Sequence, residues 1–234
     1  MIRSRKTTLT GLGIVAGLLV SLGASHAFAA TPQVLITWKT SGSYVPPGYL
    51  GKALPTYNSE ITASLEIISN GKLVDLSGQT IYWYLNNTDT LIGGGVGAQS
   101  ITFPPLGTPP NVTTLEVELP YYPGGFLIHT VSIPMVQPQT VINAPYPNGR
   151  FSSNPVTVSA LPYFFNIASP SDLSYAWSVN GQAGSNTENP NIAQITLPQG
   201  TAAGTSFGIS LTVDNHNDST QATASKNLTY QPTP

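Results

Sequence analysis

The 234-residue chain contains no cysteine, and charged residues make up only 8% of it. The lack of cysteine excludes a disulfide framework, so each domain must be held by its own apolar core, for which about 100 residues suffice. No window after the amino-terminal segment has a helical period. The apolar fraction of 40% is that of a globular protein, and the 22 glycines and 21 prolines indicate many turns. The composition therefore predicts an all-β fold.

Basic residues are scarce and gather at the amino terminus. Arg3, Arg5 and Lys6 precede an apolar run, Leu9 to Leu22, of roughly 14 residues, which is too short to span a bilayer comfortably. Small residues at Ala27 and Ala29 then fit a cleavage site. We interpret residues 1–29 as a signal peptide and expect no membrane span in the mature chain. The protein should be exported, most simply from a bacterium, to the periplasm, the cell surface or the medium.

Removal of that segment leaves five basic residues against ten acidic ones. Binding to phosphate groups requires clustered lysine and arginine. Nucleic acid is therefore excluded as an expected partner.

One strand pattern occurs twice in the chain. Trp83 and Trp177 lie 94 positions apart, and the same offset carries Leu85 onto Val179. It also carries the alternating apolar residues of 115–119 onto those of 209–213, without a gap. We infer two copies of one domain, each built around a tryptophan strand.

The repeat sets the expected domain organisation. The first domain should cover residues 30–136 and contain a long Tyr- and Pro-rich loop at 41–59. Residues 137–148, which contain three prolines, should form a stiff linker and the start of the second domain, which continues through 149–234.

The second copy carries a resemblance to a known family. The stretch Tyr175 to Gly181, YAWSVNG, puts a tryptophan on the third strand and an Asn-Gly turn after it. It resembles bacterial immunoglobulin-like domains and, more narrowly, the tyrosine-x-tryptophan strand of PKD-like domains. The resemblance covers Ala160 to Tyr230 and, more loosely, Ile61 to Val136. It implies two tandem immunoglobulin-like β-sandwiches and an accessory role at the surface or in secreted proteins.

The best candidate binding surface lies on the first domain. Loops as long as 41–59 are often functional, and this one carries Tyr44, Tyr49 and Tyr57. Tyr82 and Tyr84 lie out of phase with the apolar residues of their strand and should leave the core. Tyrosine suits protein interfaces and sugar faces alike. The alternative is that these rings pack on the first domain's own edge or on the second domain.

Catalytic and metal patterns are weak. Neither His129 nor His216 belongs to a nucleophile elbow or to a zinc-ligand spacing. Asp214, Asn215 and Asp218 offer oxygen ligands for Ca²⁺, but an ordinary hairpin turn favours the same residues. We therefore expect no enzyme activity and no cofactor.

Three functions remain open after these exclusions. The first is a secreted or surface-attached binding or structural protein, such as an adhesin, a stalk or a component of a surface assembly. The second is a periplasmic chaperone for surface subunits, although no basic cluster is evident. The third is a carbohydrate-binding module that uses exposed tyrosines. The expected partner is a protein or a glycan at the cell surface.

Overall fold

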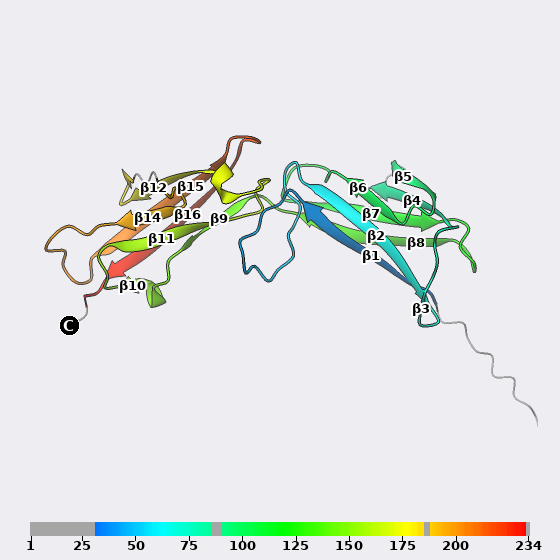
Figure 1. The fold of residues 1–234 in the computed structure, drawn as a ribbon, viewed down its shortest axis with the longest axis horizontal. Coiled ribbons are helices and arrows are strands. Elements are labelled where there is room, and N and C mark those ends of the chain that lie inside the picture. The colour runs from blue at the N-terminus through cyan, green and yellow to red at the C-terminus, as the bar shows by residue number, and fades with distance from the viewer. Residues whose placement is uncertain (1–30, 86–89, 185–187, 233–234) are drawn as a thin grey trace, which may run out of the picture. The chain divides into compact units, whose positions relative to one another are not determined.

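The computed structural model describes residues 31–85, 90–184 and 188–232. Strands dominate this part of the chain (Figure 1), and its only helices are two single 3₁₀ turns, η1 (Pro147–Gly149) and η2 (Pro170–Asp172). Within it, no helix is long and apolar enough to cross a membrane. The all-β prediction is confirmed. The signal peptide expected at residues 1–29 lies outside the described residues.

The first half of the chain forms two antiparallel sheets. In one, β2 pairs with β1 along one edge and with β3 and β6 along the other. In the second, the strand order is β5-β4-β7-β8. The strands are β1 (Gln33–Ser41), β2 (Glu60–Ser69), β3 (Lys72–Leu73), β4 (Thr80–Leu85), β5 (Leu91–Val96), β6 (Ser100–Phe103), β7 (Asn111–Leu119) and β8 (Leu127–Met135).

The second half forms another two sheets. Their orders are β14-β11-β9 and β10-β16-β15-β12-β13, and the short β10 runs parallel to the end of β16. The strands are β9 (Gln139–Asn143), β10 (Arg150–Phe151), β11 (Val156–Tyr163), β12 (Ser174–Val179), β13 (Gln182–Ala183), β14 (Ile192–Ile195), β15 (Ser206–Asn215) and β16 (Thr220–Tyr230).

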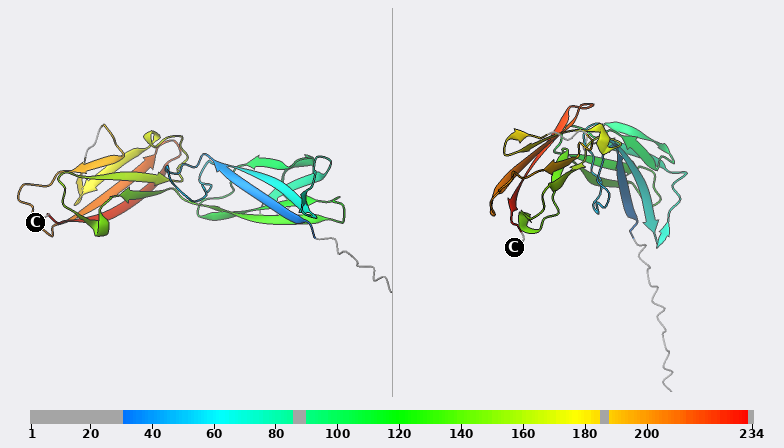
Figure 2. Two further views of the ribbon diagram at one scale, coloured as in Figure 1. Left: turned by 60° about the horizontal axis from the view of Figure 1, so that its bottom comes forward. Right: turned by 60° about the vertical axis from the view of Figure 1, so that its left-hand side comes forward.

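Both halves have the strand order of an immunoglobulin-like β-sandwich. In that fold the first, second and fifth main strands share one sheet, and the third, sixth and seventh share the other. Here β1, β2 and β6 face β4, β7 and β8, while β9, β11 and β14 face β12, β15 and β16. The fourth strand, β5 or β13, joins the sheet of the third. Figure 2 shows each half as two layers of strands.

Each pair of sheets encloses a separate apolar cluster. The first cluster includes Trp83, which is fully buried, and the second includes Trp177, which is 5% exposed. The Nε1–H group of Trp83 donates to the carbonyl oxygen of Ala98 at 2.8 Å, and that of Trp177 donates to Pro190 at 3.0 Å. Each acceptor lies on the segment that leads into the opposite sheet. Each indole therefore fills its core and links the two sheets.

The strand register also repeats between the halves. Trp83 lies opposite Val117 on β7, and Trp177 lies opposite Leu211 on β15, which is the same offset of 94 positions. Within the predicted linker 137–148, residues Gln139–Asn143 form β9 and pair with β11. The division into two domains at this segment stays a prediction.

We predict that truncating Trp177 to alanine costs about 3–5 kcal/mol of unfolding free energy, because it opens a cavity in the second core and removes the bridge between its sheets. The first core should keep its stability, since Trp83 belongs to a separate cluster. In Trp177→Ala, guanidinium unfolding followed by the fluorescence of Trp38 and Trp83 reports on the first half, and far-ultraviolet circular dichroism reports on both. Trp83→Ala provides the mirror-image control. Equal destabilisation of both cores by Trp177→Ala would show that the boundary at 137–148 is wrong or that the two halves share a large interface.

Candidate functional site

The loop between β1 and β2 is folded rather than extended. At its end, the Ser59 hydroxyl donates to the carbonyl oxygen of Thr56 at 2.8 Å and accepts from the Thr56 amide at 3.0 Å. Both residues are buried. The Val136 amide donates to the carbonyl oxygen of Pro55 at 2.9 Å, which ties the loop to the end of the first half. Ser43 adds a bond from its hydroxyl to Leu54 at 2.6 Å.

Tyr44 joins this loop to the second half of the chain. Its amide donates to the carbonyl oxygen of Phe165 at 2.8 Å, and its own carbonyl accepts from the Phe164 amide at 2.6 Å. Nearby, the side-chain amide of Asn166 donates to the Asn58 carbonyl at 3.2 Å. Gly42 passes so close that a Cβ there would lie 2.6 Å from the Asn166 Oδ1 atom. The loop therefore contacts Phe164–Asn166 largely through its backbone.

Tyr49 adds a ring contact to the same segment. Its ring meets that of Tyr163 edge-on, with centroids 5.7 Å apart, and that of Phe164 at 6.1 Å. The Tyr49 side chain keeps 37% of its surface exposed. Tyr44 and Tyr49 thus pack on the second half, which is one of the two arrangements that the sequence left open. Their use in binding a ligand stays a prediction.

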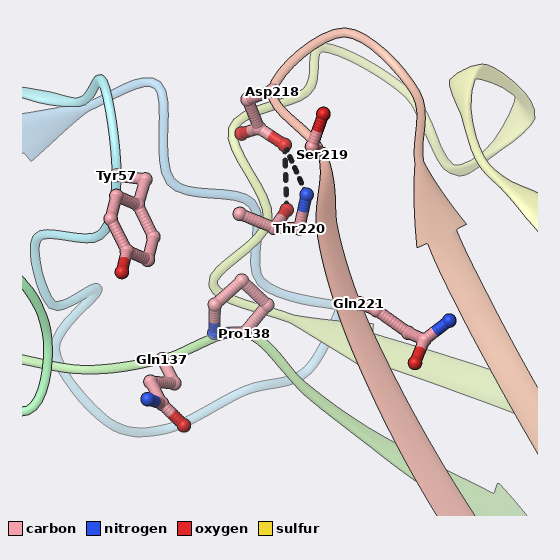
Figure 3. Close-up of a pocket in the computed structure, with 7 residues that line it drawn as sticks. All are labelled: Tyr57, Gln137, Pro138, Asp218, Ser219, Thr220 and Gln221. Atoms are coloured by element: carbon pink, nitrogen blue, oxygen red, sulfur yellow. Dashed lines mark hydrogen bonds between the residues drawn. The ribbon is translucent and has the colours of Figure 1, made fainter.

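Tyr57, the third loop tyrosine, lines a cavity of about 380 Å³ (Figure 3). Gln137 and Pro138 line it where β8 continues towards β9, and residues 218–221 line it from the turn between β15 and β16 and from the first two residues of β16. All of these except Pro138 carry a hydroxyl, amide or carboxylate group. The cavity can therefore offer an aromatic ring and several hydrogen-bonding groups to a polar ligand.

Asp218 is held in place inside this cavity. Its Oδ1 atom accepts from the amide of Thr220 at 3.1 Å and from the Thr220 hydroxyl at 2.6 Å (Figure 3). Its Oδ2 atom is buried without a hydrogen-bond partner in the described part of the chain. The cavity thus contains a carboxylate whose position is fixed by its own turn.

The candidate calcium ligands serve the same turn. Asp214 accepts from the Gln221 side chain at 2.6 Å, and Asn215 accepts from the Asn217 amide at 3.1 Å while donating to the Asn166 carbonyl at 3.3 Å. In the described ranges, no three acidic, histidine or cysteine side chains gather closely enough to hold a metal ion. Each of these side chains is thus engaged in a bond that supports the turn.

Tyr82 and Tyr84 lie elsewhere. They occupy the outer face of β4, half-buried, and alternate with the buried Ile81, Trp83 and Leu85 as expected. Their cross-strand neighbours on β7 are Glu118 and Glu116. The strands that flank the loop, β1 and β2, belong to the other sheet. Neither tyrosine lines the cavity beside Tyr57.

Sequence reasoning missed the aromatic segment Tyr163–Phe165 as the partner of the loop, and residues 218–221 as a cavity wall. Three consecutive aromatic side chains cannot all point into one core, because a strand alternates its two faces. The run of three aromatic residues was therefore the sequence feature that could have indicated this contact surface. The bond between Ser174 and His216, 3.0 Å long and exposed to solvent, was also missed.

The loop also changes the electrostatics of its neighbour Tyr175, on β12. Burial, with a smaller contribution from Tyr44, raises the pKa of Tyr175 to about 12. Its hydroxyl donates to the Pro170 carbonyl at 2.8 Å. Burial also raises the pKa of Tyr44. At the other side of the loop, the Lys52 ammonium lies 3.2 Å from the centre of the Trp38 ring, and burial lowers the Lys52 pKa.

No protein-family model and no curated protein matches the chain. Solved structures that share its general fold include fibronectin(III)-like modules of CbhA from Clostridium thermocellum (14% identity, TM-score 0.31, covering 81% of this chain and 93% of that one). Three domains of the bacteriophage RB49 outer capsid protein Hoc match at 13% identity and a TM-score of 0.37 (86% and 59%). A fragment of intimin, in complex with the intimin-binding domain of its receptor Tir, matches at 12% and 0.30 (87% and 64%). The chain thus spans less than two thirds of the Hoc and intimin chains.

We predict that Tyr175 ionises near pH 12, mainly because it is buried and to a smaller extent because Tyr44 is close to it. Its folded pKa exceeds the ordinary value of 10.0, so the folded state keeps a proton that the unfolded state releases. The resulting stabilisation is complete below about pH 10 and is lost as the pH rises through about 12. Absorbance titration at alkaline pH, compared with Tyr175→Phe, isolates this group. Tyr44→Phe should lower its midpoint. An ordinary midpoint that Tyr44→Phe leaves unchanged would contradict the contact.

Proposed function

We propose that the protein is an exported, non-enzymatic binding or structural protein of the cell surface, with two immunoglobulin-like domains in tandem. It would act as an adhesin, a stalk or a component of a surface assembly. The second domain would be of the PKD-like type, as its tryptophan strand suggests.

The observation that carries this proposal is the use of the loop at 41–59. A loop that only connected β1 to β2 would need no contacts with the second half of the chain. Here Tyr44 forms two backbone hydrogen bonds with Phe164 and Phe165, and Tyr49 packs on the same segment. These contacts of the loop therefore join the two halves of the chain, which is not what an active-site lid would do. Such a junction suits a protein that presents or spaces a binding surface.

A carbohydrate ligand is the second candidate, and the cavity beside Tyr57 favours it. Sugars present apolar ring faces and many hydroxyl groups. The cavity offers the Tyr57 ring and hydroxyl, the Ser219 hydroxyl and the side chain of Gln137, whose Nε2 group also donates to the Pro109 carbonyl at 3.0 Å. Its volume of about 380 Å³ falls within the usual range of small-ligand sites, about 300–1,000 Å³.

The test compares three Tyr→Ser variants in cell fractionation and in thermal unfolding. We expect the wild-type protein in the surface fraction, in stable complex with a surface component. Tyr57→Ser should reduce that association at least about tenfold and leave the melting temperature unchanged, since its ring faces the cavity. Tyr49→Ser should lower the melting temperature by about 2–4 °C, because it removes a ring contact worth about 1 kcal/mol. Tyr82→Ser, on the outer face of β4, is the matched control.

The outcomes separate the candidate functions. Loss of association after protease treatment of the surface indicates a protein partner, and loss after glycosidase treatment indicates a glycan. If the protein is recovered only in short-lived complexes with unassembled subunits, the result would contradict the proposed function and support the chaperone function instead. A Tyr57→Ser protein that melts several degrees lower but still associates would show that Tyr57 is structural.

A further inference from the structure

The turn between β7 and β8 exposes an unusual amount of aromatic surface. Tyr121 is 78% exposed and Phe126 is 55% exposed, while Tyr122 between them is buried in the first core. Gly124 and Gly125 have φ values of 106° and 126°, which side chains rarely adopt, so the turn can place both rings outward. No charged residue occurs between Leu119 and Leu127. We call residues 120–126 the aromatic turn.

A second feature lies in the other half of the chain. A cavity of about 400 Å³ opens beside β12, β13 and β14, with Val179, Pro198 and Phe207 among its apolar walls. The polar residues of its lining are Asn180, Gln182, Gln194 and Thr196, and no lining residue is charged. We call it the β13 cavity. A neutral cavity with apolar walls and amide groups fits a phenol or phenyl ring, because the ring fills the apolar space and the tyrosine hydroxyl can bond to an amide.

The two features cannot meet within one molecule, because both face away from the loop at 41–59. In the first half, Ser41 and Glu60 mark the loop end, and the aromatic turn belongs to the opposite end, where β4 starts. In the second half, Ser174 of β12 pairs beside the 216–219 turn near the loop. Val179, at the other end of β12, lines the β13 cavity.

The counterpart of the aromatic turn shows what such a turn does in this chain. The register that matches β7 with β15 makes the β15–β16 turn its equivalent. That turn is polar, and its residues 218–220 line the junction cavity opposite Tyr57 of the first half. One turn of this type therefore already faces the end of the other half, across a cavity. The aromatic turn is the equivalent surface with no such neighbour in the described residues.

We propose that the aromatic turn of one copy inserts Tyr121 and Phe126 into the β13 cavity of a second copy. The two surfaces differ, so the contact is heterologous, and a bound pair keeps one free turn on one copy and one free cavity on the other. Such a contact propagates head to tail into a chain of molecules. This self-association goes beyond the proposed surface function. The two proposals can fail independently, because a monomeric protein could still bind a surface partner.

The contact is small, and its affinity should be correspondingly low. Two aromatic side chains in one cavity bury less than the roughly 800 Å² per partner of a standard stable interface. Association should therefore appear in the upper micromolar range or above, and strengthen where export concentrates the protein on a surface. Both surfaces are uncharged, so moderate changes of salt should leave the affinity nearly unchanged.

The test is sedimentation velocity of the purified, exported chain over a wide concentration range. The wild type should show a continuous rise in mean mass without a limit at the dimer. Tyr121→Ser combined with Phe126→Ser should weaken association about 100-fold, since central aromatic residues dominate such contacts. Ala183→Trp, at an exposed position of the cavity, should do the same by filling it. Leu50→Ser and Thr223→Trp are matched controls at exposed sites outside both surfaces.

Mixing the two defective proteins gives the decisive result. The turn variant keeps its cavity and the Ala183→Trp variant keeps its aromatic turn, so the mixture should form one-to-one dimers that grow no further. Normal association of Ala183→Trp alone would show that two aromatic turns meet each other, and it would overturn the proposal. A wild-type protein that remains monomeric at every concentration would also overturn it and leave the turn to another occupant, such as a glycan.

Discussion

The buried tryptophan on the third main strand is the constraint on which both halves depend. Its indole fills the space between two sheets, and its single donor must be satisfied there, since a buried unpaired polar group is costly. Trp83 meets this need at Ala98 and Trp177 at Pro190, in each case on the segment entering the opposite sheet. Without a disulfide, this bond and the surrounding apolar cluster must set how the two sheets face each other.

The two halves differ in the connections and turns outside their cores. The connection between the first two strands of the first half, residues 42–59, packs on Tyr163–Asn166 of the second half. The equivalent connection in the second half instead contains β10, which pairs with β16. The turns before the last strand differ as well, being aromatic and exposed in one half and polar in the other. Differences between repeats thus mark the candidate interaction surfaces.

Alternation and repetition made most of the strands predictable, because a half-buried strand shows its period of two directly. The period could not reveal β9, which is short and lies among prolines. Nor could it reveal β5, where Gly93–Gly95 resembles a loop. A Cβ at Gly94 would lie 2.5 Å from the Ile81 carbonyl oxygen, so glycine permits the close approach. The loop tyrosines were identified from the sequence, but their neighbours, far away in the chain, were not.

Hydrogen exchange of the three indole N–H groups, observed by nuclear magnetic resonance, tests directly whether both core tryptophans are bonded across their sheets. Trp83 and Trp177 are bonded and buried, whereas the Trp38 indole is half-buried and forms no hydrogen bond with the part of the chain that the structure describes. Trp38→Phe assigns the third signal. We expect two slowly exchanging indoles and one that exchanges fast. Rapid exchange at either Trp83 or Trp177 would contradict the shared role of the two tryptophans.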